Sequence, residues 1–111
     1  MTKKIKYTES TGNVYADLGL KNPREMLVKA DLARVINQII ADRELTQVAA
    51  AKILGVNQPK ISAIANGRLA EFSIERLIEF LNKLDQDVEI FIHQKPRRSK
   101  RAALFTVAIT S

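Results

Sequence analysis

The stretch from residue 46 to residue 68 carries hydroxyls, amides and cations but no carboxylate. Its polar and charged side chains are Thr46, Gln47, Lys52, Asn57, Gln58, Lys60, Ser62, Asn66 and Arg68. Cations and amide N–H groups bind phosphates, and amides also bind the hydrogen-bonding edges of bases. These residue types therefore predict recognition of a polyanion rather than catalysis.

The remaining residues offer no catalytic or metal-binding constellation. The chain has no cysteine and one histidine, His93, which removes thiol chemistry, disulfides and cysteine metal sites. The four glycines are scattered and form no phosphate-binding loop. We expect no cofactor, no metal and no enzymatic activity. The alternative from a different functional class is a small enzyme. An RNA-binding adaptor is a further alternative, although 5% aromatic residues disfavour base stacking.

Charge is segregated along the 111 residues, whose net charge is +6. Residues 1–45 carry +2, residues 46–68 carry +3, residues 69–94 carry −4 and residues 95–111 carry +5. The acidic residues of the third stretch are Glu71, Glu75, Glu79, Asp85, Asp87 and Glu89. This pattern predicts one surface that faces an anion and another that either binds a cationic partner or is simply solvated.

The elements that position these side chains are helices. Capping residues and apolar spacing predict five of them. A short helix is expected over 13–19, and a long one from Pro23 to about Arg43. Thr46 and Asn57 cap two short helices, and Ser73 caps a fifth helix that is long enough to bury an apolar stripe. That stripe consists of Ile74, Leu77, Ile78 and Leu81.

The hydrophobic pattern changes period after these helices. Val88, Ile90 and Ile92 alternate with polar or aromatic neighbours, which predicts a strand over 88–93. The strand must pair with a second copy, with residues 104–109 or with another protein. The fold class is therefore mainly all-α: a five-helix domain over 13–94 with one short C-terminal β-strand. A flexible basic arm, 1–12, precedes it, and a basic tail, 95–111, with a possible second strand, follows.

The spacing within residues 47–64 meets the requirements of a helix-turn-helix. Two short helices that cross closely need a small residue, a turn residue that tolerates positive φ, and an apolar plug. Ala51, Gly55 and Val56 supply these, while Ile61 and Ile64 give the second helix a buried face. The alternative is an αα-hairpin that only packs.

These residues also carry a resemblance to a known family. Leu45-Thr46-Gln47, Ala51, Leu54-Gly55-Val56, Gln58, Ile61-Ser62 and Asn66-Gly67 resemble the lambda-repressor/Cro-like (XRE) helix-turn-helix family. Within it, residues 13–95 look most like antitoxins of HigA type, which pair with RelE-like toxins. The resemblance implies a five-helix lambda-repressor-like domain that binds operator DNA.

A helix-turn-helix inserts the N-terminal end of its second helix into the major groove. The candidate base contacts are Asn57, Gln58, Lys60, Ser62 and Ala63. The candidate phosphate contacts are Thr46, Gln47 and Arg68, and the resemblance implies the role of Gln47. Asn57 has the alternative role of a cap alone, Gln58 that of an ordinary surface residue, and Lys52 is expected to face solvent.

The resulting expectation is an autorepressor that binds double-stranded operator DNA as a homodimer. The resemblance implies that it is also the antitoxin of a type II toxin–antitoxin pair, whose partner is a basic RelE-like toxin. The alternative is a stand-alone XRE-type transcription regulator without a toxin. We expect a cytoplasmic protein, nucleoid-associated when bound to its operator, with no membrane contact, since the longest charge-free run is ten residues, 102–111.

Overall fold

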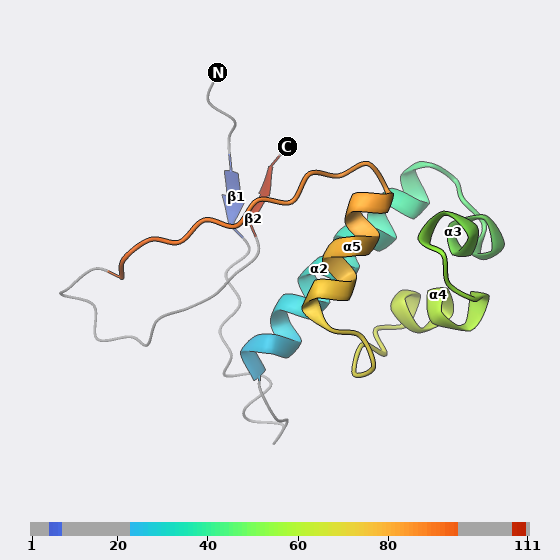
Figure 1. Cartoon of the computed structure of the whole chain (residues 1–111), viewed down its shortest axis with the longest axis horizontal. Helices are drawn as coiled ribbons and strands as arrows, with labels where there is room; N and C mark the ends of the chain where they lie inside the picture. The colour runs from blue at the N-terminus through green and yellow to red at the C-terminus, as the bar shows by residue number, and fades with distance from the viewer. Residues whose placement is uncertain (1–4, 8–22, 96–107, 111) are drawn as a thin grey trace.

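The computed structural model describes residues 5–7, 23–95 and 108–110. Four α-helices and two short strands lie in this part of the chain (Figure 1). In chain order they are β1 (Ile5–Tyr7), α2 (Pro23–Asp42), α3 (Gln47–Leu54), α4 (Gln58–Ala65), α5 (Ile74–Lys83) and β2 (Ala108–Thr110). The four helices match the expected ones from Pro23 onward.

Local signals determine where these helices begin and end. Ser73 caps α5, since its hydroxyl oxygen accepts a hydrogen bond from the Arg76 N–H at 3.0 Å. Helices α2 and α5 each end at a residue in the left-handed conformation, Glu44 with φ 54° and Asp85 with φ 63°. The chain changes direction at Glu44 before α3 begins, and after Asp85 it continues as an extended segment.

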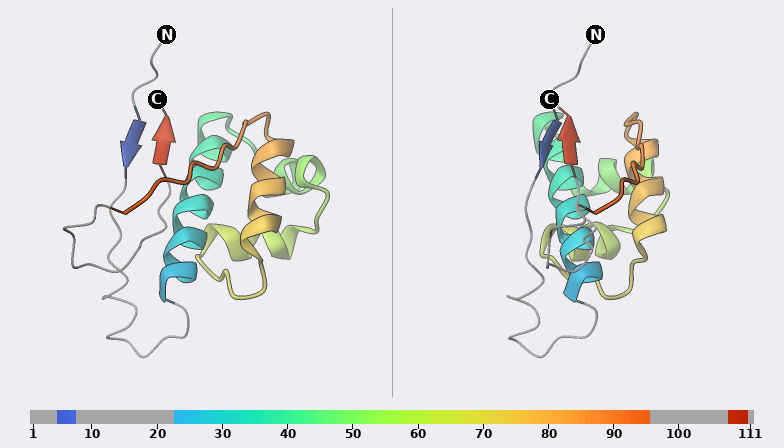
Figure 2. Two further views of the ribbon diagram at one scale, coloured as in Figure 1. Left: turned by 60° about the vertical axis from the view of Figure 1, so that its left-hand side comes forward. Right: turned by 90° about the vertical axis from the view of Figure 1, so that its left-hand side faces the viewer.

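All four helices contribute to one hydrophobic core. Its largest fully buried side chains are Ile36, Leu54, Ile64, Leu77, Phe80 and Leu84. Helices α2 and α5 pack against each other, and α3 and α4 lie along one side of this pair (Figure 2). Phe72, just before α5, meets Phe80 edge to face with ring centroids 6.0 Å apart. The core therefore holds α3 and α4 on a rigid support.

The two strands form an antiparallel pair that the sequence did not predict. Ile5 lies opposite Thr110, Lys6 opposite Ile109 and Tyr7 opposite Ala108. The pair lies beside α2, on the side away from α3 and α4 (Figure 2). Part of the expected flexible arm, 1–12, is thus a strand, and its partner lies in the tail, where a second strand was expected.

The expected strand over 88–93 is not present in the single chain. Residues 87–95 follow α5 as an extended segment that pairs with neither β1 nor β2. Alternation gives the segment a strand-like pattern, but a strand also needs a hydrogen-bonded neighbour, and the segment has none within the chain as described.

The expected count of five helices is not met either. Four are present in the part of the chain that the structure describes, and the short helix expected over 13–19 lies outside it. Of the helices described, none is both long enough and apolar enough to span a membrane.

Candidate nucleic-acid interface

Helices α3 and α4 are joined by a tight turn at Gly55. Gly55 adopts the left-handed conformation, with φ 69° and ψ 34°, and its N–H donates to the Ala51 carbonyl. The Val56 N–H donates to the same oxygen at 3.0 Å, which closes the end of α3. The expected turn at Gly55 is therefore present, and Asn57 begins the next helix two residues later.

Both helices of this pair begin at a side-chain cap. The Thr46 hydroxyl accepts a hydrogen bond from the Ala49 N–H at 3.1 Å. The Asn57 amide oxygen accepts one from the Lys60 N–H at 3.2 Å, and Pro59 occupies the first turn of α4. Neither helix has an acidic residue in its first turn. The first turns of both helices thus hold no carboxylate, and the positive ends of their dipoles favour an anion there.

A hydrogen bond connects the first residues of the two helices. Gln58 Nε2 donates to Gln47 Oε1 at 3.3 Å, and both side chains are exposed. The bond uses one of the two N–H groups of Gln58 and leaves its carbonyl oxygen and second N–H for another partner. The two amides thus lie side by side at the start of α3 and α4.

Three other predicted contact residues lie on the same part of the molecule with different degrees of exposure. The Lys60 ammonium sits 5.5 Å from the centroid of the Phe72 ring, so its side chain runs along the flank of α4. The Ser62 hydroxyl is half-buried and accepts a hydrogen bond from Asn66 Nδ2 at 3.3 Å. Arg68 is exposed in the loop after α4.

Ala63 differs from the other predicted base contacts. Its side chain is 6% exposed and belongs to the core. The reason is its place on the helix, where it lies at the edge of the buried arc that also holds Ile64 and Ile61. The methyl group of Ala63 is therefore on the packing side of α4.

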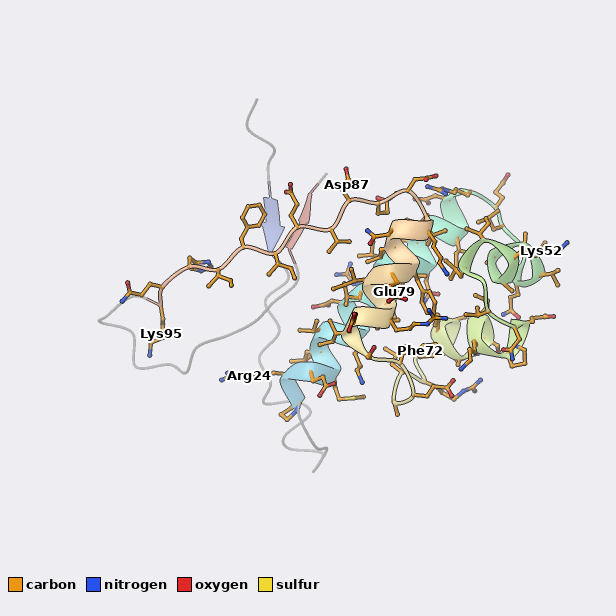
Figure 3. The ribbon with its side chains drawn as sticks, in the orientation of Figure 1. Arg24, Lys52, Phe72, Glu79, Asp87 and Lys95 are labelled. Atoms are coloured by element: carbon orange, nitrogen blue, oxygen red, sulfur yellow. The ribbon has the colours of Figure 1, made fainter. Side chains whose placement is uncertain are left out.

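The residues expected to hold the two helices together are where their roles require. Ala51, Ile61 and Ile64 are buried, and half-buried Val56 packs against the core. Lys52 is exposed and points outward from α3 (Figure 3), as expected of a solvated residue.

Side chains from α2 and α5 fix the C-terminal ends of the helices, a feature that the sequence analysis missed. Asn37 Nδ2 donates to the Ile64 carbonyl of α4 at 3.1 Å. Lys83 Nζ donates to the Leu54 carbonyl of α3 at 3.1 Å. Arg43 donates to the Leu84 carbonyl after α5. These bonds add side-chain donors to carbonyls at the helix ends, and the two cations also oppose the negative ends of helix dipoles.

The site as a whole is an exposed surface built from residues 46–68, which contain no acid, and it has two adjacent helix N-termini. It contains no group of three His, Asp or Glu side chains that could hold a metal ion, nor does the rest of the described chain. Such a surface suits a polyanion with regularly spaced phosphates and readable base edges. The fold and the site define the class of helix-turn-helix DNA-binding proteins.

Comparison with known proteins places the chain in a family of that class. A helix-turn-helix domain family matches residues 14–93. A solved structure named as an XRE family transcriptional regulator is 51% identical, with a TM-score of 0.71. The similarity covers 76% of this chain and 93% of that one. The search of curated proteins gave no match. The chain belongs to the XRE family of helix-turn-helix proteins, so 47–64 is not merely a packing hairpin.

Proposed function

We propose that the protein is a sequence-specific transcription regulator that binds double-stranded operator DNA through the N-terminal end of α4. The observation that carries this proposal is the exposed, acid-free start of α4, with Gln58 beside Gln47. A helix of this size fits the major groove, and in a helix-turn-helix the second helix enters it.

Gln58 is the proposed base-reading residue. The carbonyl oxygen and the second N–H of its amide match the N6 and N7 atoms of adenine. Because Gln58 also donates to Gln47, its amide plane is held before DNA arrives, which lowers the entropy cost of the contact. Asn57, whose oxygen already caps α4, and Ser62 are secondary base contacts.

Gln47, Thr46 and Arg68 are the proposed phosphate contacts. Oε1 of Gln47 accepts the bond from Gln58, so its amide nitrogen is the group that would donate to a phosphate. Lys60 lies along the flank of α4, beside Phe72, and there we assign it to a phosphate rather than to a guanine edge. Ala63 is not among the proposed contacts because it is buried.

Selection from a random pool of DNA duplexes tests the proposal. Repeated rounds of binding and amplification should enrich one short motif with adenine at a fixed position. Lys52→Gln serves as a control, since Lys52 points away from the proposed interface, and it should enrich the same motif. A pool that stays random after several rounds would contradict sequence-specific binding.

We further propose that the protein represses its own promoter as a homodimer and serves as the antitoxin of a basic RelE-like toxin. A single helix-turn-helix contacts few base pairs, and two-fold dimers read half-sites about one helical turn apart. The six acidic side chains of residues 69–94 are all exposed, and Glu79 is paired with Arg76 at 2.9 Å. Those on and beside α5, Glu71, Glu75, Glu79 and Asp85, offer a cationic partner an acidic surface.

Co-purification with the product of the adjacent gene tests the antitoxin role. A stable complex that shifts DNA from the shared promoter is the expected result. Replacing Glu75 and Glu79 with glutamine should weaken the complex and leave DNA binding unchanged. A protein that binds the promoter but never binds its neighbour would favour the stand-alone regulator.

A further inference from the structure

The extended segment 87–95 leaves large apolar side chains in solvent. Ile90, Phe91 and Ile92 are 76%, 72% and 94% exposed. The segment runs from the end of α5 away from α3 and α4 (Figure 1). An extended chain without a neighbouring strand offers its backbone groups to another chain.

We propose that residues 87–95 of two copies pair as antiparallel strands around a two-fold axis at Phe91, forming the dimer interface. This inference identifies the interface of the homodimer proposed above, and it rests on that proposal only in requiring a dimer. The pairing leaves the exposed faces of α3 and α4 uncovered, because the segment leads away from them.

The limits of the segment place Phe91 at its centre. On one side, the left-handed Asp85 and the bond from the Gln86 N–H to the Leu81 carbonyl form a turn that ends α5. On the other side, Pro96 has no N–H to donate to a ladder. Nine residues lie between these limits, and Phe91 is the fifth of them.

The charges of the segment complement themselves when two copies run antiparallel. Asp87 and Glu89 stand in the first half, and His93 and Lys95 in the second. Asp87 and Lys95 lie at opposite ends of the segment (Figure 3). With Phe91 on the axis, Asp87 lies opposite Lys95 of the second copy, and Glu89 lies opposite its His93. A two-fold interface requires this kind of self-complementarity, and it favours a second copy over a uniformly charged partner.

The apolar side chains complement themselves in the same register. Side chains alternate along an extended chain, so Val88, Ile90 and Ile92 share one face. Val88 already packs against the core of its own subunit. Across the axis, Ile90 of each copy lies opposite Ile92 of the other. These four isoleucines form an apolar patch that continues the core of each subunit. On the other face Phe91 lies opposite its own copy.

Cross-linking through a single cysteine tests the register, because the natural chain has no cysteine. In Phe91→Cys the two thiols lie directly opposite each other, about 4.5–5.5 Å apart between Cβ atoms. In the control Ile90→Cys they lie on a diagonal, about 7–8 Å apart, beyond disulfide reach. Under mild oxidation without DNA, Phe91→Cys should form a disulfide-linked dimer about ten times faster. Equal rates would overturn the register.

Charge exchange tests the interface by a second route. In Asp87→Lys, the new lysine of each copy lies opposite Lys95 of the other copy, so the dimer has two like-charge pairs. Typical cross-strand charge pairs indicate that the dimer dissociation constant should rise about tenfold. The double variant Asp87→Lys, Lys95→Asp exchanges the charges and should restore the native constant. Sedimentation velocity gives both values, and a double variant as weak as the single one would contradict the pairing.

The oligomeric state itself separates this inference from the proposed DNA binding. A monomer at every concentration tested would overturn the strand pairing, as would a dimer that survives Ile90→Lys and Ile92→Lys together. Neither result bears on whether α4 selects a DNA motif, which the random-pool selection measures. Because Ile90 and Ile92 are exposed, both variants should keep the native circular dichroism spectrum.

Discussion

Replacing Gly55 with alanine should destabilise the domain by about 2 kcal/mol, in two separable parts. The φ of +69° at Gly55 costs a residue that has a Cβ roughly 1 kcal/mol or more. The added Cβ would also lie 3.3 Å from Lys83 Nζ, so the ammonium must shift by a few tenths of an ångström, and we expect this shift to disrupt its hydrogen bond. That ammonium donates to the Leu54 carbonyl at 3.1 Å, and the bond contributes about 1 kcal/mol once the exposure of Lys83 is considered.

A double-mutant cycle separates the two parts. Lys83→Met alone should cost about 1 kcal/mol, because it removes the hydrogen bond to Leu54. In that background Gly55→Ala should cost only the conformational part, so the double variant loses about 2 rather than 3 kcal/mol. Urea unfolding followed by circular dichroism gives each free energy.

The control for this cycle is Lys52→Met, which changes an outward-facing lysine of α3 and should alter stability by less than about 0.5 kcal/mol. Strict additivity of Gly55→Ala and Lys83→Met would refute the reasoning. It would mean that a Cβ at position 55 does not disturb the bond from Lys83 to the Leu54 carbonyl.

Three further predictions concern the cap of α4, the core and the tail. Asn57→Ala should lower the free energy of unfolding by about 1 kcal/mol, because it removes the acceptor of the Lys60 N–H; Asn57→Asp should keep the stability in urea yet weaken DNA binding in a gel shift. Leu77→Ala, at a fully buried position, should cost about 2–5 kcal/mol in the same unfolding assay, and a smaller loss would contradict the core packing. Replacing Arg97, Arg98, Lys100 and Arg101 with glutamine should flatten the salt dependence of DNA binding by about 0.9 units of slope per lost phosphate contact, whereas an unchanged slope would mean that the tail does not touch DNA.

Features that depend on a few neighbouring residues could be predicted from the sequence. Thr46, Asn57 and Ser73 each cap a helix through a bond to the residue three positions later, so the signal is local. Gly55 was predictable for the same reason, since a left-handed turn between two short helices favours glycine. The start and end of α3 followed directly from these residues.

Contacts between distant parts of the chain could not be predicted in this way. Lys83 and Leu54 are 29 residues apart, and Asn37 and Ile64 are 27 apart. Neither pair has a local pattern, so both bonds depend on how α2 and α5 pack. Ala63 shows the same limit, because its side of α4 is decided by the elements that cover Ile61 and Ile64.

The pattern over 88–93 shows a different limit. Alternation of Val88, Ile90 and Ile92 predicts a strand, and the structure has an extended segment there without a pairing neighbour. Alternation reports which side chains share a face, while hydrogen bonding depends on a partner that the single chain does not supply. A strand at 88–93 would therefore need a hydrogen-bonding partner from a second chain.

The most direct test of the central claim is the affinity of Gln58→Ala for the selected DNA motif and for random DNA. If α4 reads bases through Gln58, the variant loses about 1–3 kcal/mol on the motif and nothing on random duplexes, at one fixed salt concentration. Fluorescence anisotropy with both duplexes gives the two constants. An equal loss on the two duplexes, or no loss on either, would contradict the reading of DNA by this helix.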